Sequence, residues 1–334
     1  MNIDDLTKID TKSMFKTYDM WPEIAEKSFL KKVDKFETKD IDHIVFCGMG
    51  GSGSIGDILT AILSTSDIHV TNVKGYLLPT TVDEKTLVIC TSISGNTKET
   101  LTTLESAKKK SCKLISFSSG GKMRELISEN ILFYEIPLIH SPRASLPNFL
   151  YYMINVLKDF LPITDDEILQ SISNLKETRN MISSKNLDSK NPSLTLAKWI
   201  DKFPIIYYPN GLQSVAIRFK NSLQENSKLH AIAEDAIEAC HNGIVGWERK
   251  SNAQPILLQG KDDYVKTKER WDILKEYFLN TEIGFKEIFS LNGNVLTKII
   301  NLIYVLDYCS IYHAVLSKID PSPVNPIDFI KQKL

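Results

Sequence analysis

Two short segments rich in glycine and hydroxyl groups have the residue types and spacing needed to hold an anion. Residues 48–53, Gly-Met-Gly-Gly-Ser-Gly, follow one apolar stretch, and residues 92–97, Ser-Ile-Ser-Gly-Asn-Thr, follow another. Glycines between a strand and a helix let the backbone turn tightly and present its N–H groups, and the helix N-terminus adds partial positive charge. Together the segments suit one phosphate monoester, held by N–H groups and Ser/Thr hydroxyls without a metal.

The glycine pattern alone does not identify the phosphate ligand. Gly-x-Gly-x-x-Gly is the fingerprint of a dinucleotide-binding turn, but such a site has Asp or Glu about 20 residues further on, after the second strand. Here that strand ends in Val73-Lys74-Gly75, and a P-loop would need Lys where this chain has Ser54. The sequence therefore favours neither a dinucleotide site nor a P-loop. For the second segment, plain N-capping of a helix by Ser94 or Thr97 stays open.

Both segments need a parallel sheet to bring them together. In the first half of the chain, apolar stretches typical of strands alternate with stretches of helical spacing. The predicted strands are 41–47, 68–73, 86–90 and 112–117, and the predicted helices are 54–63, 97–110 and 122–128. Such alternation predicts βαβ units with a parallel sheet covered on both faces. Ligands of these folds bind at the carboxyl ends of neighbouring strands, where both segments would lie.

The same pattern restarts in the second half of the chain. A proline-bracketed loop, a long apolar helix and a polar helical segment at 164–190 come first. They are followed by predicted strands at 203–208, 255–259 and 285–290 and predicted helices at 211–226, 264–278 and 295–316. The sequence predicts an α/β protein with two doubly wound domains, each a mostly parallel sheet flanked by helices. We expect domains at 15–162 and 193–334, joined by a connecting helix at 163–192.

Composition excludes several classes of protein. The 334 residues, 43% of them hydrophobic, suit two domains, and 40 Lys+Arg against 41 Asp+Glu give no basic surplus for nucleic acid. The polar N-terminus is not expected to act as a secretory signal. The apolar stretch 299–316 contains Asp307 and His313, so we expect a buried helix there and not a membrane span. Five cysteines without C-x-x-C favour small buried residues in a reducing cytoplasm. The histidines show no metal-ligand spacing, and the tryptophans are expected in the core.

Six segments together resemble a known family. GMGGSGSIGD and SISGNTKET are similar to the sugar isomerase (SIS) domain, a doubly wound module that binds phosphosugars. SPRASLP, NSLQENSK, EDAIEACHNGIVGWE and PVNPIDFIK extend the likeness to the bifunctional phosphoglucose/phosphomannose isomerase family, a branch of the phosphoglucose isomerase superfamily. The resemblance covers nearly the whole chain as two SIS domains. It is specific as a combination, although each piece alone is not.

The resemblance implies an activity and a binding site. The reaction is reversible interconversion of glucose 6-phosphate or mannose 6-phosphate with fructose 6-phosphate through a cis-enediol, with no metal or other cofactor. The residues implied at the substrate are Gly50, Gly51 and Ser52, and those implied to hold the phosphate are Ser92, Ser94 and Thr97.

The resemblance also implies catalytic roles. Arg143 would face the reacting carbons, and Glu225 would move the proton. His241 would open the sugar ring, reaching in from the partner subunit of a homodimer. Lys331 would assist, with Lys333 as the alternative. Where the family commonly has Asn-His-Asn, this chain has Cys240-His241-Asn242. The difference would change the polarity around the imidazole more than the role that the resemblance implies for it.

These residue types fit the chemistry. A carboxylate can act as the general base, and a guanidinium stays charged beside a developing enediolate. Histidine gives and takes a proton near pH 7, and the phosphate supplies remote binding energy. Taken by themselves, Glu225 near a helix end would be a solvated residue and His241 a helix-end cap.

The sequence leaves two competing functions open and disfavours a third. A phosphosugar-sensing SIS protein would keep the phosphate cradle but need no base, and no helix-turn-helix segment is evident. An isomerase of a different phosphosugar would keep the whole set. A nicotinamide dehydrogenase fails on the missing acid. The expected partner besides a second copy of the chain is therefore a phosphohexose, with no nucleic acid and no membrane.

Overall fold

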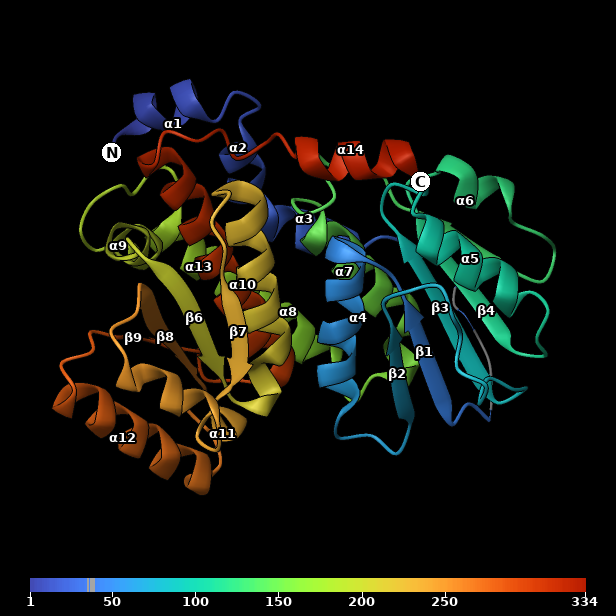
Figure 1. The fold of residues 1–334 in the computed structure, drawn as a ribbon. Helices are drawn as coiled ribbons and strands as arrows, with labels where there is room; N and C mark the ends of the chain where they lie inside the picture. The colour runs from blue at the N-terminus through green and yellow to red at the C-terminus, as the bar shows by residue number, and fades with distance from the viewer. Residues whose placement is uncertain (35, 37–39) are drawn as a thin grey trace. The chain divides into compact units, whose positions relative to one another are not determined.

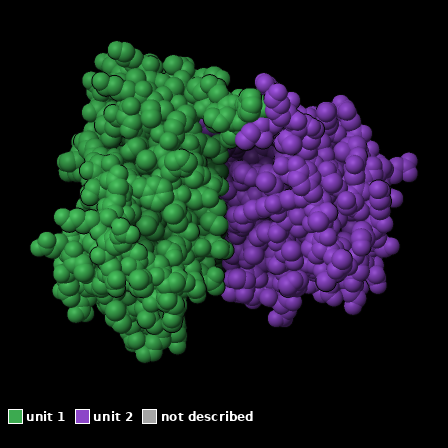
Figure 2. Space-filling model, viewed as in Figure 1, with its two compact units in different colours: residues 1–19, 170–329 green, residues 20–169, 330–334 purple. Residues whose placement is uncertain are grey.

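The structure is a computed structural model, and it describes residues 1–334 apart from 35 and 37–39. The chain divides into two compact units, coloured separately in Figure 2. Residues 20–169 with 330–334 are called the N-terminal unit, and residues 1–19 with 170–329 the C-terminal unit. One division between them falls inside helix α8 (Asp165–Ile182). The domain boundaries expected at 162/163 and 192/193 stay a prediction.

The N-terminal unit is built on a five-stranded parallel sheet in the order β2-β1-β3-β4-β5. Its strands are β1 (His43–Cys47), β2 (His69–Val73), β3 (Thr86–Ser92), β4 (Lys113–Ser118) and β5 (Leu132–Glu135). Its helices are α3 (Trp21–Phe29), α4 (Gly50–Leu63), α5 (Lys98–Ala107), α6 (Gly121–Glu125) and α7 (Leu146–Leu157). Figure 1 shows α4 and α7 on one face of the sheet and α5 and α6 on the other. Both faces are thus covered, as continuous apolar strands require.

The C-terminal unit has a four-stranded parallel sheet in the order β7-β6-β8-β9. Its strands are β6 (Phe203–Tyr208), β7 (Ile232–Asp235), β8 (Ala253–Gln259) and β9 (Lys286–Phe289). Its helices include α1 (Ile3–Ile9), α2 (Met14–Asp19), α9 (Pro192–Trp199), α10 (Gln213–Asn226), α11 (Ala236–Ala239), α12 (Val265–Asn280) and α13 (Val295–Leu316). Helix α14 (Asn325–Lys333) ends the chain. Figure 1 shows α10 and α13 on one face of this sheet and α11 and α12 on the other.

The predicted α/β class and the two parallel sheets are confirmed. Strand β6 and helix α13 have the predicted bounds, and the other predicted strands begin and end within two residues of prediction. Helix α4, however, begins at Gly50 and not at Ser54, because the N–H groups of Ser52 and Gly53 already bond to Met49 O. The glycine segment is therefore the first turn of the helix rather than a loop before it. The short strands β5 and β7 were not predicted.

Helix α13 is the central buried helix of the C-terminal unit. By length and composition alone, α13 is long and apolar enough to cross a membrane. In its most apolar stretch of 18 residues, however, 89% of the residues are buried inside the protein. Buried residues occupy every side of it, and it packs with α9 and α10. The prediction of a buried helix that contains Asp307 is confirmed.

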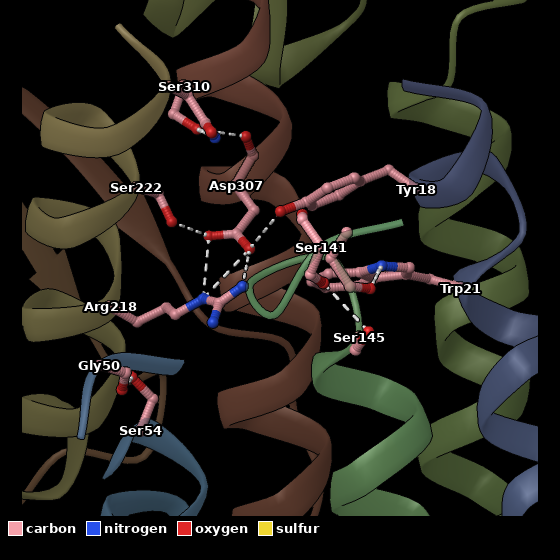
Figure 3. Close-up of polar contacts among 12 residues, drawn as sticks. Tyr18, Trp21, Gly50, Ser54, Ser141, Ser145, Arg218, Ser222, Asp307 and Ser310 are labelled. Atoms are coloured by element: carbon pink, nitrogen blue, oxygen red, sulfur yellow. Dashed lines mark hydrogen bonds and ion pairs between the residues drawn. The ribbon is translucent and has the colours of Figure 1, made fainter. Parts of the chain in front are cut away.

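Asp307 and Arg218 form an ion pair in the core of the C-terminal unit (Figure 3). Arg218 Nη2 lies 2.6 Å from Asp307 Oδ2, and the two side chains are 3% and 0% exposed. Ser222 donates to Asp307 Oδ1 at 2.7 Å, and the Tyr18 hydroxyl donates to Oδ2 at 3.2 Å. Burial alone would lower the pKa of the Arg218 guanidinium, but the Asp307 carboxylate holds that pKa above its ordinary value. The ion pair and its hydrogen bonds join α10, α13 and α2.

Removing one partner of this pair is expected to destabilise the C-terminal unit strongly. Asp307→Ala leaves a buried guanidinium without its carboxylate, and we expect a loss of about 3–5 kcal/mol in the free energy of unfolding, measured by urea titration. The control is Glu269→Ala, which removes an exposed partner of Lys266 and should change little. Similar losses in the two variants would contradict the prediction.

Candidate active site

The two segments predicted to bind an anion lie side by side at the carboxyl ends of neighbouring strands. Strands β1 and β3 are parallel neighbours with Cys47 opposite Cys90, so the segments that follow them leave the sheet together. Ser52 Oγ accepts a hydrogen bond from the backbone N–H of Ile93 at 3.1 Å, and Ser52 is only 8% exposed. This bond joins the start of α4 to the segment after β3. The predicted juxtaposition of the two segments is confirmed.

Close packing of the backbone shapes the first segment. A methyl group added at Gly53 would lie 2.8 Å from Gly48 O, and one added at Gly48 would lie 3.0 Å from Thr91 O. Gly50 differs, because it has a φ of +52° and an added methyl group there would meet open space. The N–H groups around Gly50 thus border accessible volume at the start of a 14-residue helix, where an anion is favoured.

The second segment is held by its own hydroxyls and by the segment after β4. Ser92 and Thr97 share a hydrogen bond of 3.0 Å between their side-chain oxygens, and Ser94 Oγ accepts from Asn96 N at 3.3 Å. Gly95 has a φ of +71°, and a methyl group added to it would lie 1.9 Å from Gly120 O, so only glycine fits. Thr97 stands at the N-cap of α5, yet its side chain makes no capping bond. Side-chain capping therefore does not explain these hydroxyls.

The loop before α7 brings Arg143 to the glycine segment. A methyl group added at Gly51 would lie 3.5 Å from Pro142 O and 3.8 Å from Arg143 Cα. Arg143 is 6% exposed. Ser145 fixes the loop, because its hydroxyl accepts from Ile139 N at 2.9 Å and lies 3.0 Å from Ser141 O (Figure 3). The N-terminal unit thus gathers the predicted substrate-binding residues and Arg143 at one edge of its sheet.

Trp21 also holds the Arg143 loop from a distant part of the sequence. Its indole N–H donates to Ala144 O at 3.0 Å, and the ring is fully buried. Asn148 adds a bond from Nδ2 to Pro137 O at 2.7 Å. The sequence predicted a core position for Trp21 but no contact with the site. A tryptophan 123 residues away from its hydrogen-bond partner carries no local signal of that contact.

The end of β2 carries a lysine where a dinucleotide site has an acid. Lys74 Nζ lies 2.6 Å from Asp57 Oδ2 of α4, and the lysine chain runs within 3.3 Å of the methyl position of Gly53. The lysine is thus already paired with a carboxylate of α4 and is not a free cation for a ligand. The residue that follows β2 is basic, whereas a dinucleotide site has an acid there.

Glu225 and His241 both belong to the C-terminal unit, and each has a defined environment. Glu225 lies half-buried in the last turn of α10. His241 is exposed and follows α11, whose N-terminus is capped by Asp235 through bonds to the N–H groups of Ile237 and Glu238. Asn242 donates to Glu238 Oε1 at 2.7 Å. These bonds fix the turn that presents the imidazole.

Ionisable neighbours surround the His241 turn. A methyl group added at Gly243 would lie 2.4 Å from Glu234 Oε1, so the turn packs directly on that carboxylate. Burial, helped by the nearby Glu238 charge, raises the pKa of Glu234. Burial also raises the pKa of the Cys240 thiol, the opposite of what an activated nucleophile needs. A Cys-His dyad is therefore not favoured.

The fold separates Glu225 from His241 within one chain. Strand β7 runs parallel to β6, and α10 connects the carboxyl end of β6 to the amino end of β7. Glu225, at the end of α10, therefore lies at the amino end of the sheet, whereas His241, after β7, lies at its carboxyl end. The 14 residues of α10 span about 21 Å at 1.5 Å per residue. The two side chains are not brought together in one copy.

Lys331 and Lys333 lie in the exposed last turn of α14. The boundary between the compact units falls inside this helix, after Phe329. The choice between the two lysines stays a prediction. Within the described ranges, the protein has no group of three or more His, Cys, Asp or Glu side chains arranged to hold a metal.

Comparisons with known proteins agree with the geometry. A model described as "SIS domain" matches residues 38–123, and one described as "Bacterial phospho-glucose isomerase C-terminal SIS domain" matches residues 189–334. A solved structure of a glucose-6-phosphate isomerase like protein from Thermus thermophilus matches with a TM-score of 0.65 at 12% identity, covering 100% of both chains. This likeness shows the fold alone. The protein is therefore an α/β protein with two SIS domains.

Two curated relatives define the family more narrowly. The chain is 35% identical to a bifunctional phosphoglucose/phosphomannose isomerase of Caldicellulosiruptor bescii, over 96% of this chain and 98% of that one. It is 31% identical to a protein of the same name from Aquifex aeolicus, over 90% of this chain and 95% of the relative. The chain belongs to the bifunctional phosphoglucose/phosphomannose isomerase family.

The bond between Ser52 and Ile93 can be tested without any ligand. Ser52→Ala leaves the buried N–H of Ile93 without its acceptor, and we expect a loss of about 1–3 kcal/mol in the free energy of unfolding. The matched control is Ser54→Ala, which removes only a bond to Gly50 O inside the same helix. Ser52→Ala should also weaken binding of inorganic phosphate, measured by calorimetry. Equal behaviour of the two variants would show that the bond does not hold the cradle.

Proposed function

We propose that the protein interconverts glucose 6-phosphate and mannose 6-phosphate with fructose 6-phosphate. The observation that carries the proposal is the Ser52 to Ile93 bond, which makes one phosphate cradle of two segments beside the buried Arg143. The curated relatives that match along most of the chain are named for these activities. A phosphate held at the start of α4 would fix the sugar with its open-chain carbons near a guanidinium.

The proposed chemistry is a proton transfer between neighbouring carbons. The phosphate is held by the N–H groups and hydroxyls of Gly50, Gly51, Ser52, Ser92, Ser94 and Thr97. The Glu225 carboxylate takes the C2 proton of the aldose, and a cis-enediol forms beside Arg143, whose fixed charge stabilises oxyanion character. The proton returns to C1 while another moves from O2 to O1, so the atoms balance. This sequence of steps uses no metal or redox cofactor.

We propose that the complete site forms in a homodimer. His241 would open the ring by giving a proton to the ring oxygen and taking one from the C1 hydroxyl. In one chain, Glu225 and His241 lie at opposite edges of the sheet of the C-terminal unit. The imidazole beside Glu225 would therefore come from the second copy of the chain. Exposure of His241 and of Val245, which is 59% exposed, supports an interface on that side. Lys331, or else Lys333, would complete the site.

The cysteines indicate the compartment in which we expect the protein to act. The described residues contain five unpaired cysteines, three of them buried, which suits a reducing cytoplasm. Domains at 15–162 and 193–334 with a connecting helix at 163–192 remain our proposed division.

Two alternative functions fit the same residues. A phosphosugar sensor would use the same cradle, and an isomerase of a different phosphosugar would use the whole site. Turnover of fructose 6-phosphate distinguishes the proposed isomerase from a sensor, and the choice of substrate distinguishes it from an isomerase of a different phosphosugar.

A coupled assay with fructose 6-phosphate tests the activity. We expect both glucose 6-phosphate and mannose 6-phosphate to form without added metal, and to disappear in Glu225→Gln because the base is lost. Glucose 6-phosphate alone would indicate a relative of narrower specificity. Absence of turnover, with fructose 6-phosphate still raising the melting temperature, would contradict the proposal and favour the sensor.

Mixing two inactive variants tests the shared site. Glu225→Gln and His241→Asn homodimers should each be inactive, but a heterodimer contains one site with both wild-type side chains. Random exchange of subunits after mild denaturation should therefore restore about a quarter of wild-type activity, since half of the dimers are mixed and half of their sites are intact. If the activity of the mixture is no higher than the mean activity of the two separate variants, the shared-site proposal is wrong. Sedimentation that shows a fully active monomer would also contradict it.

A further inference from the structure

Lys228 adopts an unusual backbone conformation immediately after α10. Its φ is +56°, in the left-handed region that residues other than glycine rarely enter. The turn closes the helix, because Leu229 N bonds to Leu223 O at 3.2 Å and Ser227 N bonds to the same oxygen at 3.0 Å. Glycine is the usual residue at such a position. Lysine is uncommon there, so the contacts of the Lys228 side chain need to be considered.

The ammonium of Lys228 lies among backbone carbonyl groups from two segments. Nζ donates to Glu225 O at 2.6 Å and to Pro323 O at 2.8 Å, with Asn226 O and Pro321 O each at 3.5 Å. The left-handed turn directs the side chain back over the helix end that carries Glu225. Lys228 therefore connects the last turn of α10 to residues 321–323, the segment just before α14.

The opposite side of the same helical turn is anchored to α13. Asn226, fully buried, donates from Nδ2 to Ser310 Oγ at 2.8 Å. Ser227 Oγ donates to Ser310 O at 2.8 Å, and Ser310 Oγ donates to Asp307 O at 2.6 Å. The backbone of Glu225 is thus fixed by α13 on one side and by the Lys228 ammonium at its own carbonyl.

Electrostatics gives the ammonium a second effect. The C-terminal end of a helix carries partial negative charge from its unpaired carbonyls, which disfavours a carboxylate in the last turn. Lys228 places a full positive charge on those carbonyls.

We propose that Lys228 is a positioning residue for the Glu225 base. It orients the last turn of α10, offsets the negative helix end, and ties that turn to the segment that leads into α14. This inference rests on the proposed isomerase function. It predicts that loss of the ammonium impairs proton transfer more than binding of the phosphosugar, since the phosphate cradle lies in the N-terminal unit and does not include Lys228.

The decisive variant is Lys228→Gly, because glycine accepts the left-handed turn and removes the ammonium. We expect kcat for fructose 6-phosphate to fall about 10- to 100-fold, the size typical of a misplaced catalytic group. KM and the melting temperature should stay near wild-type values, since the backbone strain is relieved. Lys228→Arg, which keeps a cation near the carbonyls, should recover part of the lost kcat.

Lys318 supplies a matched control. It takes a left-handed turn after α13 with a φ of +58°, and Ile319 N bonds back to Ala314 O at 2.8 Å. Its ammonium contacts no partner in the part of the chain that the structure describes. Lys318→Gly should therefore leave kcat unchanged while relieving the same kind of strain.

The outcomes separate this inference from the function on which it rests. A wild-type kcat in Lys228→Gly overturns the positioning role while leaving the isomerase in place. A fall in kcat accompanied by an equal rise in KM and a lower melting temperature, without recovery in Lys228→Arg, also overturns it, because that pattern marks a purely structural residue. A wild-type protein with no isomerase activity overturns the proposed function and this inference together.

Discussion

The parallel direction of the strands is the constraint on which the rest of the structure depends. In the N-terminal unit it places the segments after β1 and β3 at one edge, where Ser52 and Ile93 join them. In the C-terminal unit the same rule makes α10 return to the amino end of the sheet, so that Glu225 and His241 end on opposite edges. One topological rule thus brings the two glycine- and hydroxyl-rich segments together in one unit and holds Glu225 and His241 apart in the other.

Features that depend on local chemistry were predictable from the sequence. Glycines after an apolar strand mark a tight turn into a helix because the turn itself needs them. Strand β6 and helix α13 are continuous apolar stretches, and the polar residues at their ends mark their bounds. Strands β5 and β7 were missed because each has four residues and charged or exposed positions, Leu-Phe-Tyr-Glu and Ile-Ala-Glu-Asp, which give no clear alternation. Both lie at sheet edges, where such residues are tolerated.

The contacts that hold the site were not predictable, because they join distant parts of the chain. Trp21 fixes the Arg143 loop through Ala144, and Gly120 closes over Gly95 from the next strand. No spacing rule links these residues, since the sheet order that brings them together is set by packing across the whole unit. The start of α4 is a related case. Its glycines predicted a loop, but the helix already begins at Gly50, and Gly53 inside the first turn must be glycine because an added methyl group would lie 2.8 Å from Gly48 O.

The polar side chains between α10 and α13 explain why Glu225 has a defined place. Arg218, Ser222 and Asn226 recur every four residues on one face of α10, opposite Asp307 and Ser310 of α13. Burying these groups contributes little net stability compared with an apolar interface of the same volume. Each polar pair, however, is satisfied in one register only, and we expect these pairs to specify the register of α10 more strictly than apolar contacts alone would. The register carries Glu225 with it, so the buried charges and amides fix the helical turn from which that carboxylate extends.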